Sequence, residues 1–274
     1  MYKANKLGGS TDVANDWGSN NWGNANASRT SLSFGGNAKL ANGLMINGNV
    51  NYVNTTQETP PVAPSYFADY GSSGDASLFS RLFYLPRNFN LTGFPFENPV
   101  SRDNVFYRAL DNPIWLAKYS RYTSDVNRAF GNLTLSYDVT PWLNLMAKGG
   151  INTYHEARKN ITRNGGIFFP AGRIWTDDLV NTEIDMNYIA TFSHKLSQDL
   201  DLRVMVGLNN NQRSFSSQFV NATGIITSSL LNANATTTQI VSNSRRLQRL
   251  YAVYADAQLS YKNYLYLGVV ARND

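Results

Sequence analysis

Few side chains in this sequence have the types and the spacing that catalysis or metal binding requires. The two histidines, His155 and His194, each lack a second ligand at the spacing of a zinc motif. Asp69 and Asp75 flank a Gly/Ser stretch, but the regular ligand offsets and the final glutamate of a calcium loop are missing there. The chain has no cysteine, which excludes disulfides, thiolate metal sites and cysteine nucleophiles. The sequence therefore predicts no catalytic residue, no metal site and no cofactor, and we expect a protein that is not an enzyme.

Residues suited to binding a ligand gather in two long stretches, 79–119 and 155–184. Aromatic faces stack on sugar rings, and arginine donors bind hydroxyls or carboxylates. The same rings would also serve as the small core that a long ordered loop needs, and the sequence leaves both interpretations open. The candidate ligand-contacting or lid-contacting residues are Arg81, Arg87, Phe94, Arg102, Tyr107, Arg108, Trp115 and Trp175.

The composition of the chain favours a β-protein. Its 274 residues are 42% hydrophobic, 16% charged and 13% aromatic, so charged residues are scarcer than the roughly 25% of an ordinary soluble domain. The net charge of +5 is mild and no run of five basic residues occurs, so we expect no nucleic-acid partner. No stretch approaches the 18 consecutive apolar residues of a membrane helix.

Apolar and polar residues alternate with a period of two in eight segments, which predicts strands rather than helices. In the segment 44–54, for example, Leu44, Ile46 and Val50 share one face and asparagines share the other. An Asn-Gly pair, the strongest signal for a short hairpin turn, precedes this segment. The segments are 29–40, 44–54, 127–139, 143–154, 185–196, 200–209, 246–261 and a final run from Leu265.

The connections between these segments alternate strictly between short turns and long links over about 55–126, 155–184 and 210–245. This alternation is typical of an outer-membrane barrel. A twelve-residue strand tilted near 45° rises roughly 28 Å, close to the thickness of the hydrocarbon core. One face would then contact lipid, and the other would line a wet lumen. The candidate lumen-wall residues are Asn47, Asn49, Asn51, Asn144, Lys148 and Arg203.

Aromatic residues repeat at the ends of the predicted strands. Tyr137, Trp142, Tyr261 and Tyr264 flank the short turns, where the aromatic girdle of a membrane barrel is expected. The alternative is that tyrosine and tryptophan are simply common in strands.

Several motifs resemble those of the SusC/RagA-like TonB-dependent transporters of Gram-negative outer membranes. The resemblance extends from about residue 29 to the end of the chain. It is carried by Leu78-Phe79-Ser80-Arg81-Leu82-Phe83-Tyr84-Leu85-Pro86-Arg87, Asp111-Asn112-Pro113-Ile114-Trp115, the stretch from Asn127 to Leu143 (NRAFGNLTLSYDVTPWL) and the closing stretch from Tyr264 to Asp274 (YLYLGVVARND). It implies a 22-stranded barrel filled by a plug, which imports oligosaccharides or peptides with a SusD-like surface lipoprotein. The implied partners are TonB, through a plug region, and outer-membrane lipid.

We therefore expect an all-β chain: an arc of about eight strands of a larger antiparallel up-and-down transmembrane β-barrel. Residues 1–28 would be an extracellular loop segment and residues 29–274 part of the barrel in the outer membrane. No apolar signal segment opens the chain, and an apolar run closes it, which favours a piece of a longer barrel. The alternatives are a passive porin or surface adhesin, and a soluble carbohydrate-binding β-sandwich.

Overall fold

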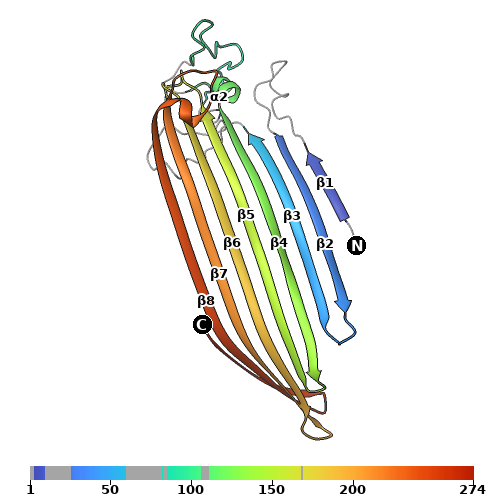
Figure 1. Ribbon diagram of the computed structural model, residues 1–274. Coiled ribbons are helices and arrows are strands. Elements are labelled where there is room, and N and C mark those ends of the chain that lie inside the picture. Colours follow the sequence, from blue (N-terminus) through green and yellow to red (C-terminus); the bar gives the residue numbers. More distant parts are fainter. Residues whose placement is uncertain (1–2, 10–25, 60–81, 83–84, 106–110, 168) are drawn as a thin grey trace.

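The computed structural model describes residues 3–9, 26–59, 82, 85–105, 111–167 and 169–274 (Figure 1). All strands belong to one sheet in which each is hydrogen-bonded to its neighbours in chain order, and every pair is antiparallel. The strands are β1 (Lys3–Gly9), β2 (Asn26–Lys39), β3 (Met45–Thr59), β4 (Arg121–Thr140), β5 (Leu143–Thr162), β6 (Arg173–Lys195), β7 (Leu200–Ile225), β8 (Thr236–Tyr261) and β9 (Leu265–Asn273). Helix α2 (Pro113–Tyr119) and the 3-10 turn η3 (Ala233–Ala235) lie in the long connections.

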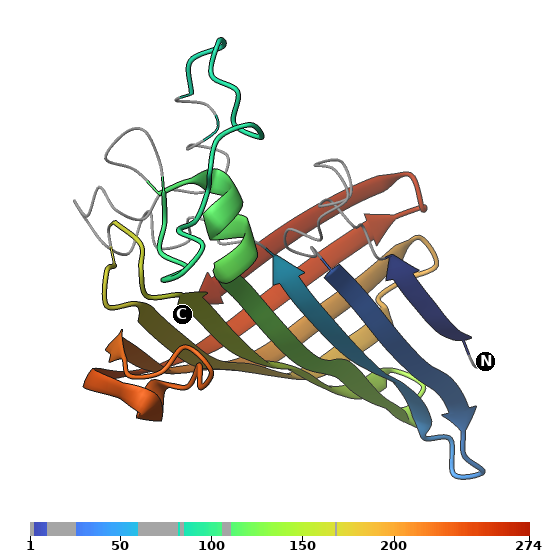
Figure 2. The same cartoon turned by 90° about the horizontal axis from the view of Figure 1, so that it is seen from above.

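This architecture confirms the predicted fold class, an arc of an up-and-down β-barrel. Seen from above, the strands form a curved wall (Figure 2). The short turns lie at one end of the wall, and α2 and the long connections lie at the other (Figure 1). The described residues form one sheet without a second layer packed on it, so the β-sandwich alternative is wrong.

Two details of the prediction need correction. A ninth strand, β1, lies inside the 1–28 segment that was expected to be a loop, and it pairs with β2. The links expected over 155–184 and 210–245 are mostly strand, because β5, β6, β7 and β8 continue far past the predicted ends. Beyond the apolar rows these strands carry polar residues on both faces, with apolar residues such as Trp175 and Phe219 among them, so the period-two signal is lost although the backbone pairing continues.

The short turns follow from local backbone chemistry. Gly43 of the Asn-Gly pair has a φ of 88°, and its N–H donates to the Leu40 carbonyl at 2.9 Å. In the β8–β9 turn, Lys262 and Asn263 have φ values of 47° and 57°, the pair of left-handed residues that a type I′ hairpin requires. Such turns match the twist of the flanking strands and therefore set the register of each hairpin.

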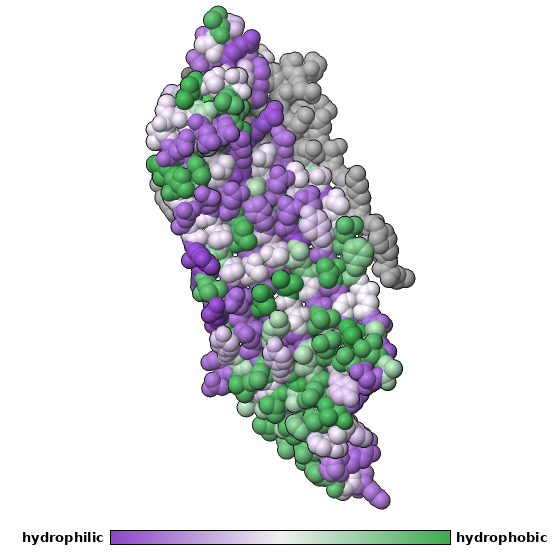
Figure 3. Space-filling model, in the orientation of Figure 1, coloured by the Kyte–Doolittle hydropathy of each residue, from purple (hydrophilic) through white to green (hydrophobic). Residues whose placement is uncertain are grey.

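Register brings the predicted apolar rows together into one continuous face. Ile46 pairs with Leu135, which pairs with Ala147, and the same row continues through Tyr188, Leu208 and Val253. We call this side the apolar face and the opposite side the polar face. Large apolar side chains on the apolar face stay exposed: Val50 is 62% exposed, Leu133 49% and Leu208 52%. Most hydrophobic side chains gather over the part of the wall near the short turns, whereas the upper part is mostly hydrophilic (Figure 3).

The strands are staggered as a barrel wall requires. Met45 is the first residue of β3, and its registered row reaches Met146, three residues into β5, and Gly207, seven residues into β7. The short turn of each later hairpin therefore lies further from the Met45 row than the turn of the hairpin before it. Such a progressive shift is the shear that tilts strands in a closed barrel.

A close approach of two strands makes one glycine hard to replace. A Cβ atom on Gly131 would lie 2.2 Å from the backbone oxygen of Asn49, whereas nothing lies within 4 Å of a Cβ on Gly36. We expect Gly131→Ala to destabilise the full-length protein by about 1–3 kcal/mol, because the backbone of β3 must shift. Gly36→Ala is the matched control and is expected to be neutral or slightly stabilising. Denaturant unfolding in lipid measures both; equal midpoints for the two variants would contradict the close approach.

Candidate functional site

The polar face carries a band of amide and charged side chains that crosses five neighbouring strands. Its middle row consists of Asn49, Asn132, Gly150, Asp185 and Asn211, which are successive registered partners from β3 to β7. Alternation places every second residue of each strand on this face, so the band also includes the residues two positions above and below.

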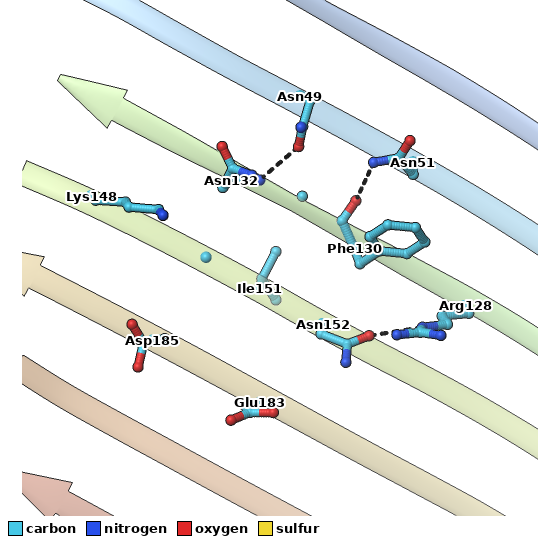
Figure 4. A pocket seen from close by; sticks show the side chains of 12 residues that line it. Asn49, Asn51, Arg128, Phe130, Asn132, Lys148, Ile151, Asn152, Glu183 and Asp185 are labelled. Atoms are coloured by element: carbon cyan, nitrogen blue, oxygen red, sulfur yellow. Dashed lines mark hydrogen bonds between the residues drawn. The ribbon is translucent and has the colours of Figure 1, made fainter.

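Gly150 is one of the residues that line a hollow in this band, and Figure 4 shows the side chains around this hollow. The hollow has a volume of about 390 Å³, and its polar lining includes Asn49, Asn132, Arg128, Lys148, Glu183 and Asp185. Because Gly150 has no side chain and a Cβ there would meet nothing closer than 3.8 Å, the backbone of β5 forms the floor. We call it the Gly150 hollow.

On the β3–β4 side of the hollow, side chains are held by backbone and amide hydrogen bonds. Asn49 Oδ1 accepts from the Asn132 backbone N–H at 3.2 Å, and Asn51 Nδ2 donates to the Phe130 carbonyl at 3.4 Å. Arg128 Nε donates to Asn152 Oδ1 at 2.9 Å, and its guanidinium lies 4.9 Å from the centre of the Phe130 ring. These contacts orient the arginine, and within the described part of the chain its terminal nitrogens make no hydrogen bond.

On the β6 side, a carboxylate is surrounded by neutral donors. Asp185 accepts from Nδ2 of Asn187 at 2.5 Å and from Nδ2 of Asn209 and Asn211, each at 3.1 Å. Glu183 Oε1 accepts from Asn211 Nδ2 at 3.0 Å and from Arg213 Nε at 2.9 Å. Amide donors hold the Asp185 carboxylate in place but add no positive charge to it.

The predicted lumen-wall residues all lie on the polar face, but they do not form one cluster. Asn49, Asn51 and Lys148 line the Gly150 hollow, and Asn47 lies one row nearer the short turns. Asn144 is close to a short turn, where its Nδ2 donates to Asp138 Oδ1 at 2.7 Å. Arg203 lies opposite Ser193 and Gln258, also near that end.

The acidic side of the hollow was not predicted from the sequence. Glu183, Asp185 and Asn187 recur at every second position, and Asn209, Asn211 and Arg213 do the same on β7. This polar alternation was a usable signal. It did not show that Asp185 lies beside Asn211, because that proximity depends on the register between β6 and β7.

Two loops dock on each other at the end of the wall that carries the long connections. Trp115 of α2 is fully buried, and its Nε1 donates to the Arg102 carbonyl at 2.9 Å. The buried Asp111 carboxylate accepts from the Ile167 N–H at 2.6 Å, and the Asn104 N–H donates to the Gly165 carbonyl at 2.9 Å. The β3–β4 connection is thus tied to the β5–β6 loop.

Helix α2 begins and ends at defined capping contacts. The fully buried Asn112 is its N-cap, with Oδ1 accepting from the Ile114 N–H at 2.9 Å, and Pro113 occupies the first turn. The Ser120 N–H donates to the Leu116 carbonyl at 2.9 Å, and Ser120 is extended where β4 follows. The Asn-Pro-Ile-Trp stretch therefore positions Trp115 between the two loops.

Glu97 ties the same loop together by charge. Its carboxylate accepts from Arg102 Nη1 at 2.8 Å, from Lys118 Nζ at 3.0 Å and from the Tyr119 hydroxyl. Burial opposes ionisation of Glu97, but these hydrogen bonds outweigh it and hold its pKa below the ordinary value of 4.5.

Acid is expected to loosen this loop. Because the pKa of Glu97 is lower in the folded loop, the cluster stabilises the loop above pH 4.5, and that contribution disappears as the pH falls through the folded value. Amide protection factors of residues 112–120, corrected for intrinsic exchange, should fall on acidification in the wild type. Glu97→Gln should lower protection at neutral pH and remove the acid dependence. An identical acid dependence in both proteins would contradict this role.

The structure places the loop candidates in different environments. Trp115 is fully buried and Trp175 is 6% exposed, so both belong to packed regions. Trp175 lies 5.9 Å from the rings of Tyr122 and Phe219, centre to centre. Phe94 is half-buried against Phe89, whereas Arg87 and Arg102 are exposed. Arg81, Tyr107 and Arg108 lie outside the described residues.

Within the described part of the chain, no group of three or more His, Cys, Asp or Glu residues could hold a metal ion. Of the helices described there, none has the length and apolar character needed to cross a membrane.

The curved antiparallel sheet and its two chemically distinct faces define a β-barrel wall. Solved structures with a similar fold are those of the RagAB peptide importer in the open-open state (TM-score 0.72, 14% identity, covering 91% of this chain and 27% of that chain) and in the closed-closed state (TM-score 0.72, 14% identity, 92% and 28%). A third is the RagAB peptide transporter (TM-score 0.68, 14% identity, 91% and 28%). All three are structures of transporters.

The chain spans little more than a quarter of the length of those chains. At 14% identity the likeness shows the fold. No protein-family profile matches the chain, and no curated protein matches it.

Proposed function

We propose that this chain is a lipid-embedded wall segment of a larger outer-membrane importer of the SusC/RagA type. The observation that carries the proposal is the exposed apolar face, which continues in register from β2 to β9. A contiguous apolar surface of this extent on a soluble protein would drive association, whereas hydrocarbon is its natural neighbour.

The height of the apolar face supports a membrane location. On β4 the apolar row runs from Ala129 to Val139, eleven residues that rise about 26 Å at a tilt of 45°. That height equals the apolar band of outer-membrane barrels, which is about 25 Å. Beyond Ala129 the same row becomes polar: Asn127 Oδ1 accepts from the Tyr52 hydroxyl at 2.7 Å.

Aromatic residues near the short turns support the same location. Trp142 is 49% exposed and stacks on Phe192 at 6.1 Å, and Tyr264 is 70% exposed beside Tyr261 at 5.8 Å. Rings of this kind anchor a barrel at the headgroup level of one leaflet. The opposite end, with α2 and the docked loops, is then extracellular.

The remaining parts of the proposal concern the whole transporter. The polar face lines the lumen, the docked loops face a SusD-like surface lipoprotein, and a plug coupled to TonB opens the path for oligosaccharides or peptides. The fold shared with the RagAB peptide importer and the residues resembling the SusC/RagA family support this assignment.

Uptake by the full-length protein in a Gram-negative host tests the proposal against a passive porin. We expect uptake of an oligosaccharide or peptide substrate to require both this protein and TonB. Uptake that continues unchanged after TonB is removed would instead identify a passive pore.

A further inference from the structure

Two exposed arginines continue the apolar row of β8 beyond its apolar part. Odd-numbered residues of β8 lie on the apolar face, and the apolar row runs from Tyr261 to Tyr251. The next residues on the same face are Arg249, Leu247 and Arg245, and all three are exposed. The row thus changes from apolar to cationic at the edge that the proposed function places at the top of the hydrocarbon layer.

The height of these arginines matches the polar layer of a bilayer. At a strand tilt of 45°, Arg249 lies about 5 Å above Tyr251 and Arg245 about 14 Å above it. The headgroup layer is roughly 5–8 Å thick on each side of the hydrocarbon. Arg249 therefore lies at headgroup level, with the 62% exposed Tyr251 at the boundary below it. Arg245 lies beyond this layer, and its long side chain can reach back towards it.

The two arginines have no carboxylate partner. Gln212 and Ser216 face them from β7, and both are uncharged. On the same face of the described strands, the nearest carboxylate in register is that of Asp178 on β6, two strands away from β8. By contrast, Arg121 of β4, on the same face, has a partner: its Nη1 lies 3.2 Å from Glu58 Oε1. The arginines of β8 are therefore available to an anion from outside the chain.

Gln212 orients Arg249 without neutralising it. Arg249 Nε donates to Gln212 Oε1 at 2.9 Å, and its terminal nitrogens make no hydrogen bond within the described residues. A guanidinium presents a fork of donors that fits the oxygens of a phosphate. Arg249 and Arg245 are four residues apart, about 13 Å along the strand, so each is placed to bind a phosphate of its own.

We propose that Arg249 and Arg245 form an outward-facing site for the phosphate groups of anionic lipid headgroups in the outer leaflet. The acyl chains of such a lipid lie along the apolar row below Tyr251, and the 48% exposed Leu247 adds an apolar contact between the two arginines. Cations at a membrane surface bind anionic headgroups, and a lipid without phosphate loses this attraction. The proposal rests on the proposed function, because it needs lipid at the apolar face and the long connections on the outer-leaflet side.

Native mass spectrometry of the full-length protein in detergent tests the site, with the apparent dissociation constant of the first bound lipid as the readout. The probes are lipid A, which carries two phosphates, and its dephosphorylated form, with inorganic phosphate as competitor. We expect lipid A to bind about tenfold more tightly than the dephosphorylated form, and inorganic phosphate not to displace it. The double variant Arg245→Gln/Arg249→Gln should weaken lipid A binding about tenfold to thirtyfold and leave the dephosphorylated form unchanged.

Arg246→Gln is the matched control, since Arg246 is an exposed cation on the same strand but lies opposite Phe215 on the polar face. Its affinity for lipid A should equal that of the wild type. Unchanged binding in the double variant, an equal loss in Arg246→Gln, or displacement by inorganic phosphate would overturn the site. None of these results decides whether the apolar face meets lipid, because that contact is measured separately on β4.

Discussion

Replacing Leu133 with arginine is expected to destabilise the full-length barrel by about 2–4 kcal/mol. Leu133 lies near the middle of the apolar row of β4, between Gly48 and Gly149 in register, and is 49% exposed. If hydrocarbon surrounds it, a guanidinium there loses its hydration and must reach towards a distant headgroup region. Reversible urea unfolding in lipid bilayers measures the loss.

The neighbouring residue supplies the control for this experiment. Thr134 is on the polar face between Asn47 and Lys148, so Thr134→Arg places the same charge one residue away in water. We expect its unfolding free energy to remain close to that of the wild type. If the two variants lost the same stability, the lipid-facing assignment of the apolar face would be wrong.

Replacing Trp115 with alanine is expected to unfold the docked loops without unfolding the barrel. The side chain is fully buried and packs 5.5 Å from the Tyr119 ring, and a Cβ atom on Gly166 would lie 3.3 Å from its six-membered ring. Truncating a buried tryptophan costs about 3–5 kcal/mol. Hydrogen exchange should show the loss of protection in both α2 and the 163–172 segment, because Trp115 holds the two together.

Two further variants separate this role from a general effect of removing tryptophan. Trp142→Ala removes a 49% exposed ring near a short turn and should leave loop protection unchanged. Trp115→Phe keeps most of the packing but loses the hydrogen bond to Arg102, at a cost of about 1–2 kcal/mol. Unchanged protection of residues 163–172 in Trp115→Ala would contradict the docking of the two loops.

The sequence predicts the fold well where one strand face is apolar. Leu133, Val50 and Leu208 were placed on the correct face by alternation alone, and the structure pairs their rows in register. The Asn-Gly turn was also predicted correctly, although only Gly43 of the pair has a positive φ. These features need only neighbours along the chain.

The predicted strand ends were wrong where the two faces of a strand no longer differ in polarity. The upper parts of β6, β7 and β8 carry polar residues on both faces, so 155–184 and 210–245 resembled loops although most of their residues are paired. Backbone hydrogen bonds stabilise these extensions without requiring an apolar side chain. Composition alone cannot distinguish such a strand from a loop.

The candidate site was only half predictable for a different reason. Asn49 and Lys148 were identified from their own strands, whereas the opposing Asp185 depends on which strands are neighbours and in what register. The ambiguity over the loop rings is resolved for Trp115, which is buried, because burial depends on contacts with the distant segment around Gly166. Long-range proximity carries no local sequence signal.

Single-cysteine labelling along β4 tests the central claim most directly. The chain has no cysteine of its own, so each position from 129 to 137 except Gly131 can be replaced in turn in the full-length protein, with any cysteine elsewhere removed. With a spin label attached, we expect odd positions to be accessible to oxygen dissolved in the bilayer and even positions to a water-soluble nickel chelate, in strict alternation. Uniform access of the nickel chelate to both sets would show that water covers both faces and would contradict the account.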